Sequence, residues 1–128
     1  MSRELLKSTK FYAPKFRYTP CVKTGPWYTL SGMVAIDPTT EKLVSGGPYA
    51  ETKHILSLLQ AGSSEWGLTL NHLIQARIYT TKFDQFPEIN KAWEEFFTTI
   101  DPPARTSIGV AALPLGATVE MEFSFYAA

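Results

Sequence analysis

The chain has 128 residues, of which 45% are hydrophobic and 19% are charged. This size and composition fit one globular domain and exclude a disordered chain. Twelve basic and twelve acidic side chains cancel, so no general field draws the chain to nucleic acid or to an anionic membrane. We therefore expect a single domain over residues 1–128, with neither nucleic acid nor membrane as a partner.

The cellular setting is predicted from two further features. Cys21 is the only cysteine, so the chain cannot form an internal disulfide or a cysteine metal site. The sequence MSRELLKSTKFY at the amino terminus contains no apolar core of a signal peptide, and no apolar run approaches the ~20 residues that span a bilayer. These features favour a cytoplasmic protein.

The first predicted strand region is WYTLSGMVAI at residues 27–36, which is rich in aromatic and β-branched residues. The region forms either one strand or two strands with a break, since Gly32 lies inside it and can interrupt a strand. An interior glycine indicates a bulge, a bend or the close approach of another group. A loop over residues 37–48 follows, and Pro48 suits the first turn of a helix.

The next two segments are predicted to be a helix and a strand. Helical spacing connects five residues that end before Gly67: Ile55, Leu58, Leu59, Gly62 and Trp66. The segment 72–81 alternates as a strand does. The alternation puts Ile74, Ala76, Ile78 and Thr80 on one side and Leu73, Gln75, Arg77 and Tyr79 on the other.

A second helix and two strands complete the prediction. The helix has Pro87 in its first turn and ends at Asp101, and its apolar face consists of Phe86, Ile89, Trp93, Phe96, Phe97 and Ile100. Strands are expected over residues 104–113 and 117–126. In the last strand, Val119, Met121, Phe123 and Phe125 alternate with Glu120, Glu122, Ser124 and Tyr126.

This order of elements predicts an α+β fold. We expect a two-layer sandwich in which a mixed sheet of five or six strands carries both helices on one face. The other face would be open, yet Tyr, Trp and Leu side chains recur on both sides of the strands. Such a face is most simply covered by sister subunits, so the pattern favours an oligomer.

Few residues offer chemistry. His54 and His72 are far apart in sequence and lack metal-binding spacing, and the common nucleotide-binding and acyl-transfer motifs do not occur. Arg105 and Glu120 remain, on strands that we expect to be neighbours. From the residues alone, two charges in apolar strands favour a structural ion pair, or a pair at a subunit contact, over a catalytic pair.

A sequence motif changes this interpretation. The stretch PPARTSIGVAALPLGATVEMEF resembles the carboxy-terminal signature of the RidA/YjgF family. This signature is a Pro-Ala-Arg segment, a strand of small residues, Leu-Pro, and a strand in which apolar residues alternate with glutamate. The resemblance continues upstream in Ser31-Gly32, Asp37-Pro38 and Asn90 ahead of the aromatic helix residues.

The resemblance implies a fold, an assembly and an activity. The fold would be chorismate-mutase-like, in a homotrimer whose sheets form a barrel with three clefts between subunits. The activity would be hydrolytic deamination of reactive 2-enamino or 2-imino acids, such as 2-aminoacrylate and its imine tautomer, to 2-keto acids and ammonia. No cofactor is implied.

The resemblance also assigns roles to residues. Arg105 would hold the substrate carboxylate through paired N–H donors, and Glu120 would hold a water and act as the general base. Tyr18 and Ser31 match the pocket hydroxyls of the family, and Asn90 would hold pocket backbone. Ser107 completes the expected substrate-binding set, at a position where the family often has cysteine, and Glu122 would make a structural pairing.

Other departures leave the substrate open. Phe16-Arg17 precede Tyr18 where the family often has Gly-Pro, and Met33 follows Gly32 where it often has Gln. We hypothesise that Arg17 meets a second carboxylate of a larger imine. The alternative function is a non-catalytic trimer that binds small carboxylates or regulates a partner. A ribonuclease is disfavoured, since the chain lacks net charge and a basic aromatic stripe.

Overall fold

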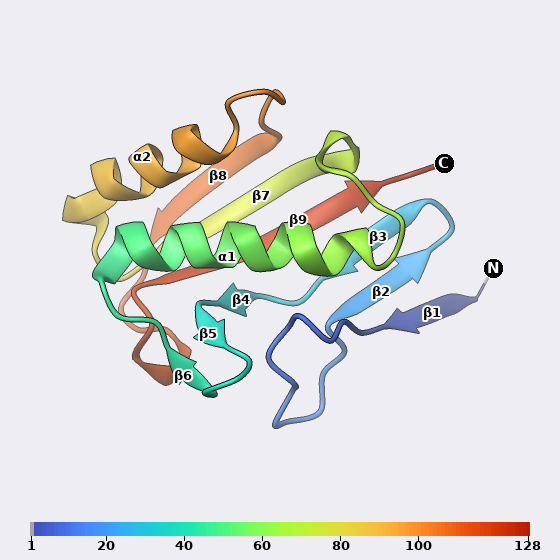
Figure 1. The fold of residues 1–128 in the computed structure, drawn as a ribbon, viewed down its shortest axis with the longest axis horizontal. Coiled ribbons are helices and arrows are strands. Elements are labelled where there is room, and N and C mark those ends of the chain that lie inside the picture. Colours follow the sequence, from blue (N-terminus) through green and yellow to red (C-terminus); the bar gives the residue numbers. More distant parts are fainter. Residues whose placement is uncertain (1) are drawn as a thin grey trace.

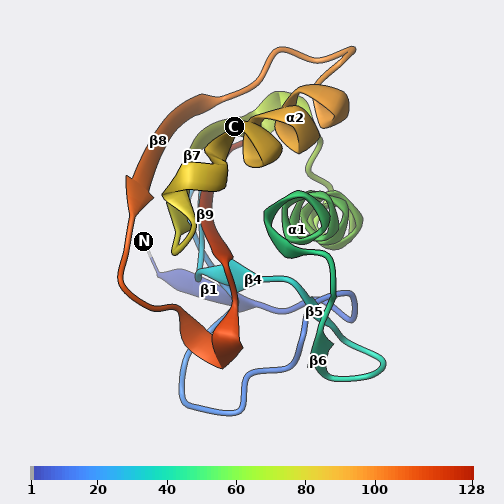
Figure 2. The same cartoon turned by 90° about the vertical axis from the view of Figure 1, so that its left-hand side faces the viewer.

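The computed structural model describes residues 2–128, so residue 1 of the expected domain lies outside the described residues. Two helices pack on one face of a curved, mixed sheet of seven strands (Figures 1 and 2). The helices are α1 (Gly47–Ser64) and α2 (Phe86–Phe96). The sheet strands are β1 (Arg3–Leu6), β2 (Cys21–Thr24), β3 (Trp27–Leu30), β4 (Met33–Val34), β7 (Leu73–Thr80), β8 (Ala104–Gly109) and β9 (Val119–Tyr126).

The predicted architecture is confirmed, although the sheet has more strands than the five or six expected. The strand order is β1-β2-β3-β9-β7-β8, and β4 also pairs with β9. The pairing of β7 with β8 is parallel and the other pairings in this sheet are antiparallel. A separate hairpin joins β5 (Ile36–Asp37) and β6 (Lys42–Leu43). The sequence prediction missed β1 and β2.

The break expected near Gly32 is a β-bulge between β3 and β4. On β9, Ser124 pairs with Thr29 and Met121 pairs with Met33. Met33 is four residues after Thr29, whereas Met121 is only three residues before Ser124. The segment that contains Gly32 therefore has one residue more than the β9 segment opposite it. The bulge bends the chain beside Glu120.

A second bulge corrects the predicted alternation of β7. The register of β7 against β9 shifts between Leu73 and Gln75. Leu73 is therefore buried, while Ile74 is 39% exposed, the reverse of their predicted sides. From Gln75 onward the strand alternates as expected, with Ala76 and Ile78 fully buried.

The second helix is shorter than predicted. It ends at Phe96, and the backbone of Phe97 leaves helical geometry at φ −97° and ψ 58°, while its N–H still donates to the carbonyl of Trp93. The β-branched run from Thr98 to Ile100 disfavours a further helical turn. The Phe97 ring packs against Trp93 and Phe96 instead, at centroid distances of 4.7 and 4.9 Å.

The core lies between the helices and the sheet. Ile55, Leu56 and Leu59 of α1 and Ile89 and Trp93 of α2 pack there. From β9 the core receives every second side chain, which are Val119, Met121, Phe123 and Phe125. The opposite face of the sheet carries exposed apolar side chains, namely Leu5, Trp27, Ile108 and Tyr126. No helix within residues 2–128 combines the length and apolar character that crossing a membrane requires.

A buried carboxylate joins the first helix to the start of β9. Glu51 of α1 is 2% exposed. Its oxygens accept hydrogen bonds from the backbone N–H of Thr118 at 2.8 Å, the hydroxyl of Thr118 at 2.7 Å and the backbone N–H of Val119 at 3.2 Å. These bonds satisfy donors that would otherwise be buried without partners, and they hold β9 in line for Glu120.

We predict that Glu51→Ala lowers the free energy of unfolding by about 3 kcal/mol, because two backbone donors and a hydroxyl lose their acceptor. Urea denaturation followed by circular dichroism measures the change. Gln60→Ala, at an exposed position of the same helix, is the control and should change stability by less than about 0.5 kcal/mol. An equal effect of both substitutions would contradict the anchoring role of Glu51.

Candidate functional site

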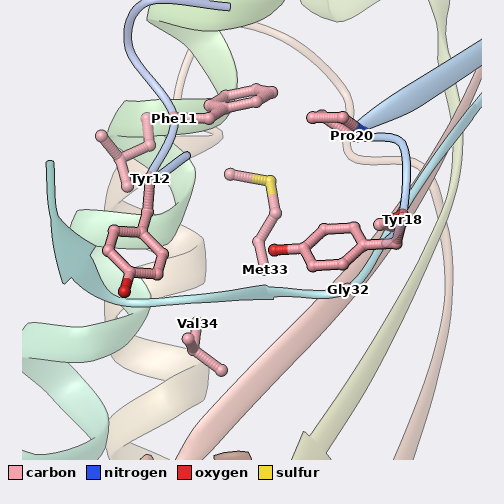
Figure 3. Close-up of a pocket in the computed structure, with 9 residues that line it drawn as sticks. Phe11, Tyr12, Tyr18, Pro20, Gly32, Met33 and Val34 are labelled. Carbon is pink, nitrogen blue, oxygen red and sulfur yellow. The ribbon is translucent and has the colours of Figure 1, made fainter. Parts of the chain in front are cut away.

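Three of the predicted site residues meet at one cavity. Tyr18, Ser31 and Glu120 line a cavity of about 570 Å³, together with Gly32 and apolar side chains that include Tyr12, Phe16 and Leu115. A smaller cavity of about 60 Å³ adjoins it (Figure 3) and shares Tyr18, Ser31 and Gly32 with it. We call this group of Tyr18, Ser31 and Glu120 the glutamate half-site.

Glu120 lies against the bulge. A Cβ atom built on Gly32 would be 2.5 Å from Oε2 of Glu120 and 3.0 Å from its Cδ. Any larger residue at position 32 would therefore push the carboxylate away. Glycine therefore leaves the space that the Glu120 carboxylate occupies at the wall of the cavity.

Burial raises the pKa of Glu120 above its usual value, and the negative charge of Glu122 raises it further. Both effects disfavour the ionised carboxylate and make it a better proton acceptor once it is ionised. Glu122 lies two residues along the same strand and accepts a hydrogen bond from the hydroxyl of Tyr79. Glu122 thus has the structural pairing that the sequence predicted.

The two hydroxyls of the glutamate half-site differ in what they can offer. The hydroxyl of Ser31 donates to the carbonyl oxygen of Thr19 at 2.6 Å. Its proton is used there, so its oxygen is left to accept a hydrogen bond from a ligand. Burial raises the pKa of Tyr18, which keeps its phenol protonated and able to donate. The ring of Tyr18 extends toward Met33 in Figure 3.

Arg105 belongs to a different part of the molecule. It lies on β8 and pairs with Ala76, which is fully buried on the helix side of the sheet. Its guanidinium lies over the rings of Phe86 and Trp93 of α2, at 5.4 and 5.1 Å from their centroids. These stacking contacts hold the cation at the edge of the sheet. Burial lowers the pKa of Arg105, against the effect of Glu94, but a guanidinium remains charged at neutral pH.

Asn90 and Ser107 lie close to Arg105 in the fold. Asn90 is four residues after Phe86 and three before Trp93, so it shares the helix face of the two rings beneath Arg105. Ser107 is two residues after Arg105 on the same strand, so both side chains point to the same side of the sheet. We call Asn90, Arg105 and Ser107 the arginine half-site.

The two half-sites are on opposite faces of the sheet. Glu120 pairs with Tyr79, whose side chain alternates with those of Ala76 and Ile78, whereas Arg105 is in register with Ala76. The prediction that Arg105 and Glu120 lie on neighbouring strands is wrong, because β7 separates β8 from β9. The hypothesis of an ion pair within one chain fails for the same reason. Sequence periodicity could not show this, since the order of strands in a sheet is not visible in it.

Sequence reasoning also missed several lining residues. Tyr12, Lys15, Phe16 and Leu115 line the larger cavity, but only contact across the fold brings the segment 11–20 to the loop before β9. Arg17, which was hypothesised to meet a second carboxylate of a larger imine, is not among the lining residues of either cavity. Lys15 does line the larger one, and its ammonium forms an ion pair with Glu41 at 2.6 Å.

Comparison with known proteins identifies the family. The model of the family described as endoribonuclease L-PSP matches residues 9–127. The chain belongs to this family, which is also the RidA/YjgF family. It is 30% identical over 120 residues to a mouse protein named 2-iminobutanoate/2-iminopropanoate deaminase, covering 94% of this chain and 88% of that one. It is 29% identical over 126 residues to a RutC family protein of Pyrococcus abyssi, covering 98% of each.

A solved structure agrees with the fold. The crystal structure of RidA from an Antarctic Psychrobacter superposes with a TM-score of 0.89 at 28% identity, covering 96% of this chain and 98% of that one. The α+β architecture that the RidA resemblance implies is therefore confirmed. Members of the family include proteins named as imine deaminases, at about 30% identity to this chain.

We predict that Glu122→Gln lowers the pKa of Glu120, because it removes the like charge and leaves only burial to raise that pKa. Carboxyl-carbon NMR titration of Glu120 measures the shift, and exposed Glu4 serves as an internal reference. An unchanged or higher pKa in the variant would show that the charge of Glu122 does not act on Glu120.

The same raised pKa has a consequence for stability. When the pKa of a carboxyl group is higher in the folded chain than in the unfolded chain, ionisation costs more in the folded state. The contribution of Glu120 to the free energy of unfolding is therefore unfavourable at pH 7, above its unfolded pKa. Glu120→Gln should therefore keep or increase the stability at pH 7. A residue retained at some cost in stability is typical of a functional site.

Proposed function

We propose that the chain is an enamine/imine deaminase that hydrolyses 2-imino acids, such as those related to 2-aminoacrylate, to 2-keto acids and ammonia. The observation that carries this proposal is the glutamate half-site, where a partly buried carboxylate of raised pKa and the hydroxyls of Tyr18 and Ser31 line one largely apolar cavity. The membership of the family and the names of its relatives support the reaction class.

The proposed reaction needs both half-sites, but one chain keeps them on opposite faces of its sheet. We therefore propose that each active site forms between two subunits of a homotrimer. One subunit supplies Arg105, Asn90 and Ser107, and the next supplies Tyr18, Ser31 and Glu120. The exposed apolar side chains on the open sheet face, including Trp27 and Tyr126 at 51% and 40% exposure, support burial against other copies.

Substrate binding would follow from the charges. Arg105 would bind the carboxylate of the imino acid through two parallel N–H donors, already oriented by the rings of Phe86 and Trp93. Ser107 and Asn90 lie on the same side and could add hydrogen bonds to the carboxylate or hold the backbone near it. This binding would place the imine carbon opposite Glu120, and correct placement supplies much of the rate.

The chemistry would then use Glu120 as the base. Its carboxylate takes a proton from a water as the water oxygen bonds to carbon 2, which gives a tetrahedral carbinolamine. Starting from the protonated imine, Glu120 returns that proton to the nitrogen and the carbon–nitrogen bond breaks to release ammonia. The freed Glu120 carboxylate accepts the hydroxyl proton as the oxygen becomes the carbonyl oxygen. The oxygen of Ser31 would accept an N–H of the leaving group, and the phenol of Tyr18 would donate to the substrate. An enamine would first become an imine by protonation at carbon 3.

We predict that Glu120→Gln lowers kcat by at least 100-fold with little change in binding, because the amide cannot accept a proton from water. Wild-type activity should fall as the pH drops through the raised pKa of Glu120. Release of keto acid from an imine made in the assay by an amino-acid oxidase provides the measurement. A protein that only binds carboxylates would show no acceleration in the wild type and unchanged affinity in the variant.

We also predict that Arg105→Ala abolishes measurable activity while the oligomer persists, because the carboxylate loses its anchor. Arg105→Lys should restore little of it, since an ammonium cannot make the paired contact. Sedimentation equilibrium monitors the assembly. Full activity of the lysine variant would show that a point charge suffices and would contradict bidentate binding.

The cellular setting is proposed from the net charge and the single cysteine. A chain with one buried cysteine and no net charge suits a cytoplasmic enzyme that acts on small molecules and binds neither nucleic acid nor membrane. The proposed chemistry uses water and side chains, so it needs no cofactor.

A further inference from the structure

Two exposed apolar side chains flank the cavity beside Glu120. Phe16, in the segment before β2, is 85% exposed, and Leu115, in the turn before β9, is 62% exposed. Both line the larger cavity. Neither contributes much to the core in this position, so the packing of a single chain does not account for them.

Leu115 also has an unfavourable backbone. Its φ is 61° and its ψ is 22°, a left-handed conformation that side chains other than glycine rarely adopt. Glycine would fit the turn better, and Gly116 follows it with a φ of 73°. A leucine that is both strained and exposed points to a role in contact with a ligand.

The charges around this cavity favour an uncharged ligand group. Lys15 and Glu120 are the charged residues in its lining. The ammonium of Lys15 is paired with Glu41 and lies 5.4 Å from the ring centroid of Tyr12, while Glu120 would repel an acidic group. Val34, which pairs with Glu120 across β4 and β9, adds to the apolar wall and points away from Met33 in Figure 3.

We infer that the cavity binds the side chain of the substrate, and that this chain prefers 2-imino acids with a branched or aromatic apolar side chain held between Phe16 and Leu115. This inference rests on the proposed function and names the substrate class for it. The cavity of about 570 Å³ has a largely apolar lining that suits such a side chain. Arg17 is not among the residues that line this cavity.

The experiment compares kcat/KM for imines generated from phenylalanine, leucine and alanine. The wild type should favour the phenylalanine or leucine imine over the alanine imine. The measured ratio is kcat/KM for the phenylalanine or leucine imine divided by kcat/KM for the alanine imine. Phe16→Ala and Leu115→Gly should each lower this ratio by about tenfold, the scale expected for lost apolar contacts in a substrate pocket. Leu115→Gly should also keep or raise the thermal midpoint, because glycine relieves the left-handed backbone.

Gln60→Ala is the control, since Gln60 is an exposed residue of α1 that lies outside both cavities. It should leave the ratio unchanged. Sedimentation of each variant reports whether Phe16 or Leu115 instead covers a second copy of the chain.

The outcomes separate the inference from the proposed function. Unchanged ratios in both cavity variants, or a wild type that prefers the alanine imine, would overturn the inference while deamination itself stands. Weakened assembly in place of altered selectivity would overturn it as well. Absence of activity on all three imines from an assembled wild type would instead refute the proposed function.

Discussion

The side chains of β9 alternate between the core and the candidate site, so the register of this one strand affects both stability and the proposed chemistry. Val119, Met121, Phe123 and Phe125 enter the core on one side of the strand, and Glu120 and Glu122 leave on the other. Because side chains alternate strictly along a strand, a slip of one residue would bury two carboxylates and expose the core. Glu51 fixes the start of the strand and the bulge at Gly32 fits against Glu120. The same register therefore sets the core and the position of the proposed base.

Much of this arrangement could be predicted from local patterns. The period-two alternation of residues 119–126 gave the correct sides of β9. Gly32 indicated a bulge, a bend or the close approach of another group, and the structure has a bulge there with Glu120 close to it. The failures have physical causes. A one-residue bulge reversed Leu73 and Ile74, and a β-branched run with aromatic packing ended α2 at Phe96. Such effects depend on contacts between distant segments, which local periodicity does not contain.

The sequence named the candidate site residues but not their arrangement in the fold. The family motif drew attention to Arg105 and Glu120, but it could not show that β7 lies between their strands or that they face opposite sides of the sheet. Likewise, Phe16 and Leu115 became visible as cavity residues only when the fold brought their loops together. Because a single chain keeps the two half-sites apart, we propose that activity requires an oligomer. Oligomerisation would also cover the exposed apolar surface of the sheet.

The most direct test of this account mixes two inactive variants. Arg105→Ala and Glu120→Gln subunits, carrying different tags, are co-expressed and the mixed oligomers are purified. If each site takes its arginine and its glutamate from different subunits, every mixed trimer regains one of its three sites, because a closed ring repeats one heterologous contact. Activity near one third of that of the wild type is the expected result. Mixed oligomers as inactive as either parent would contradict it.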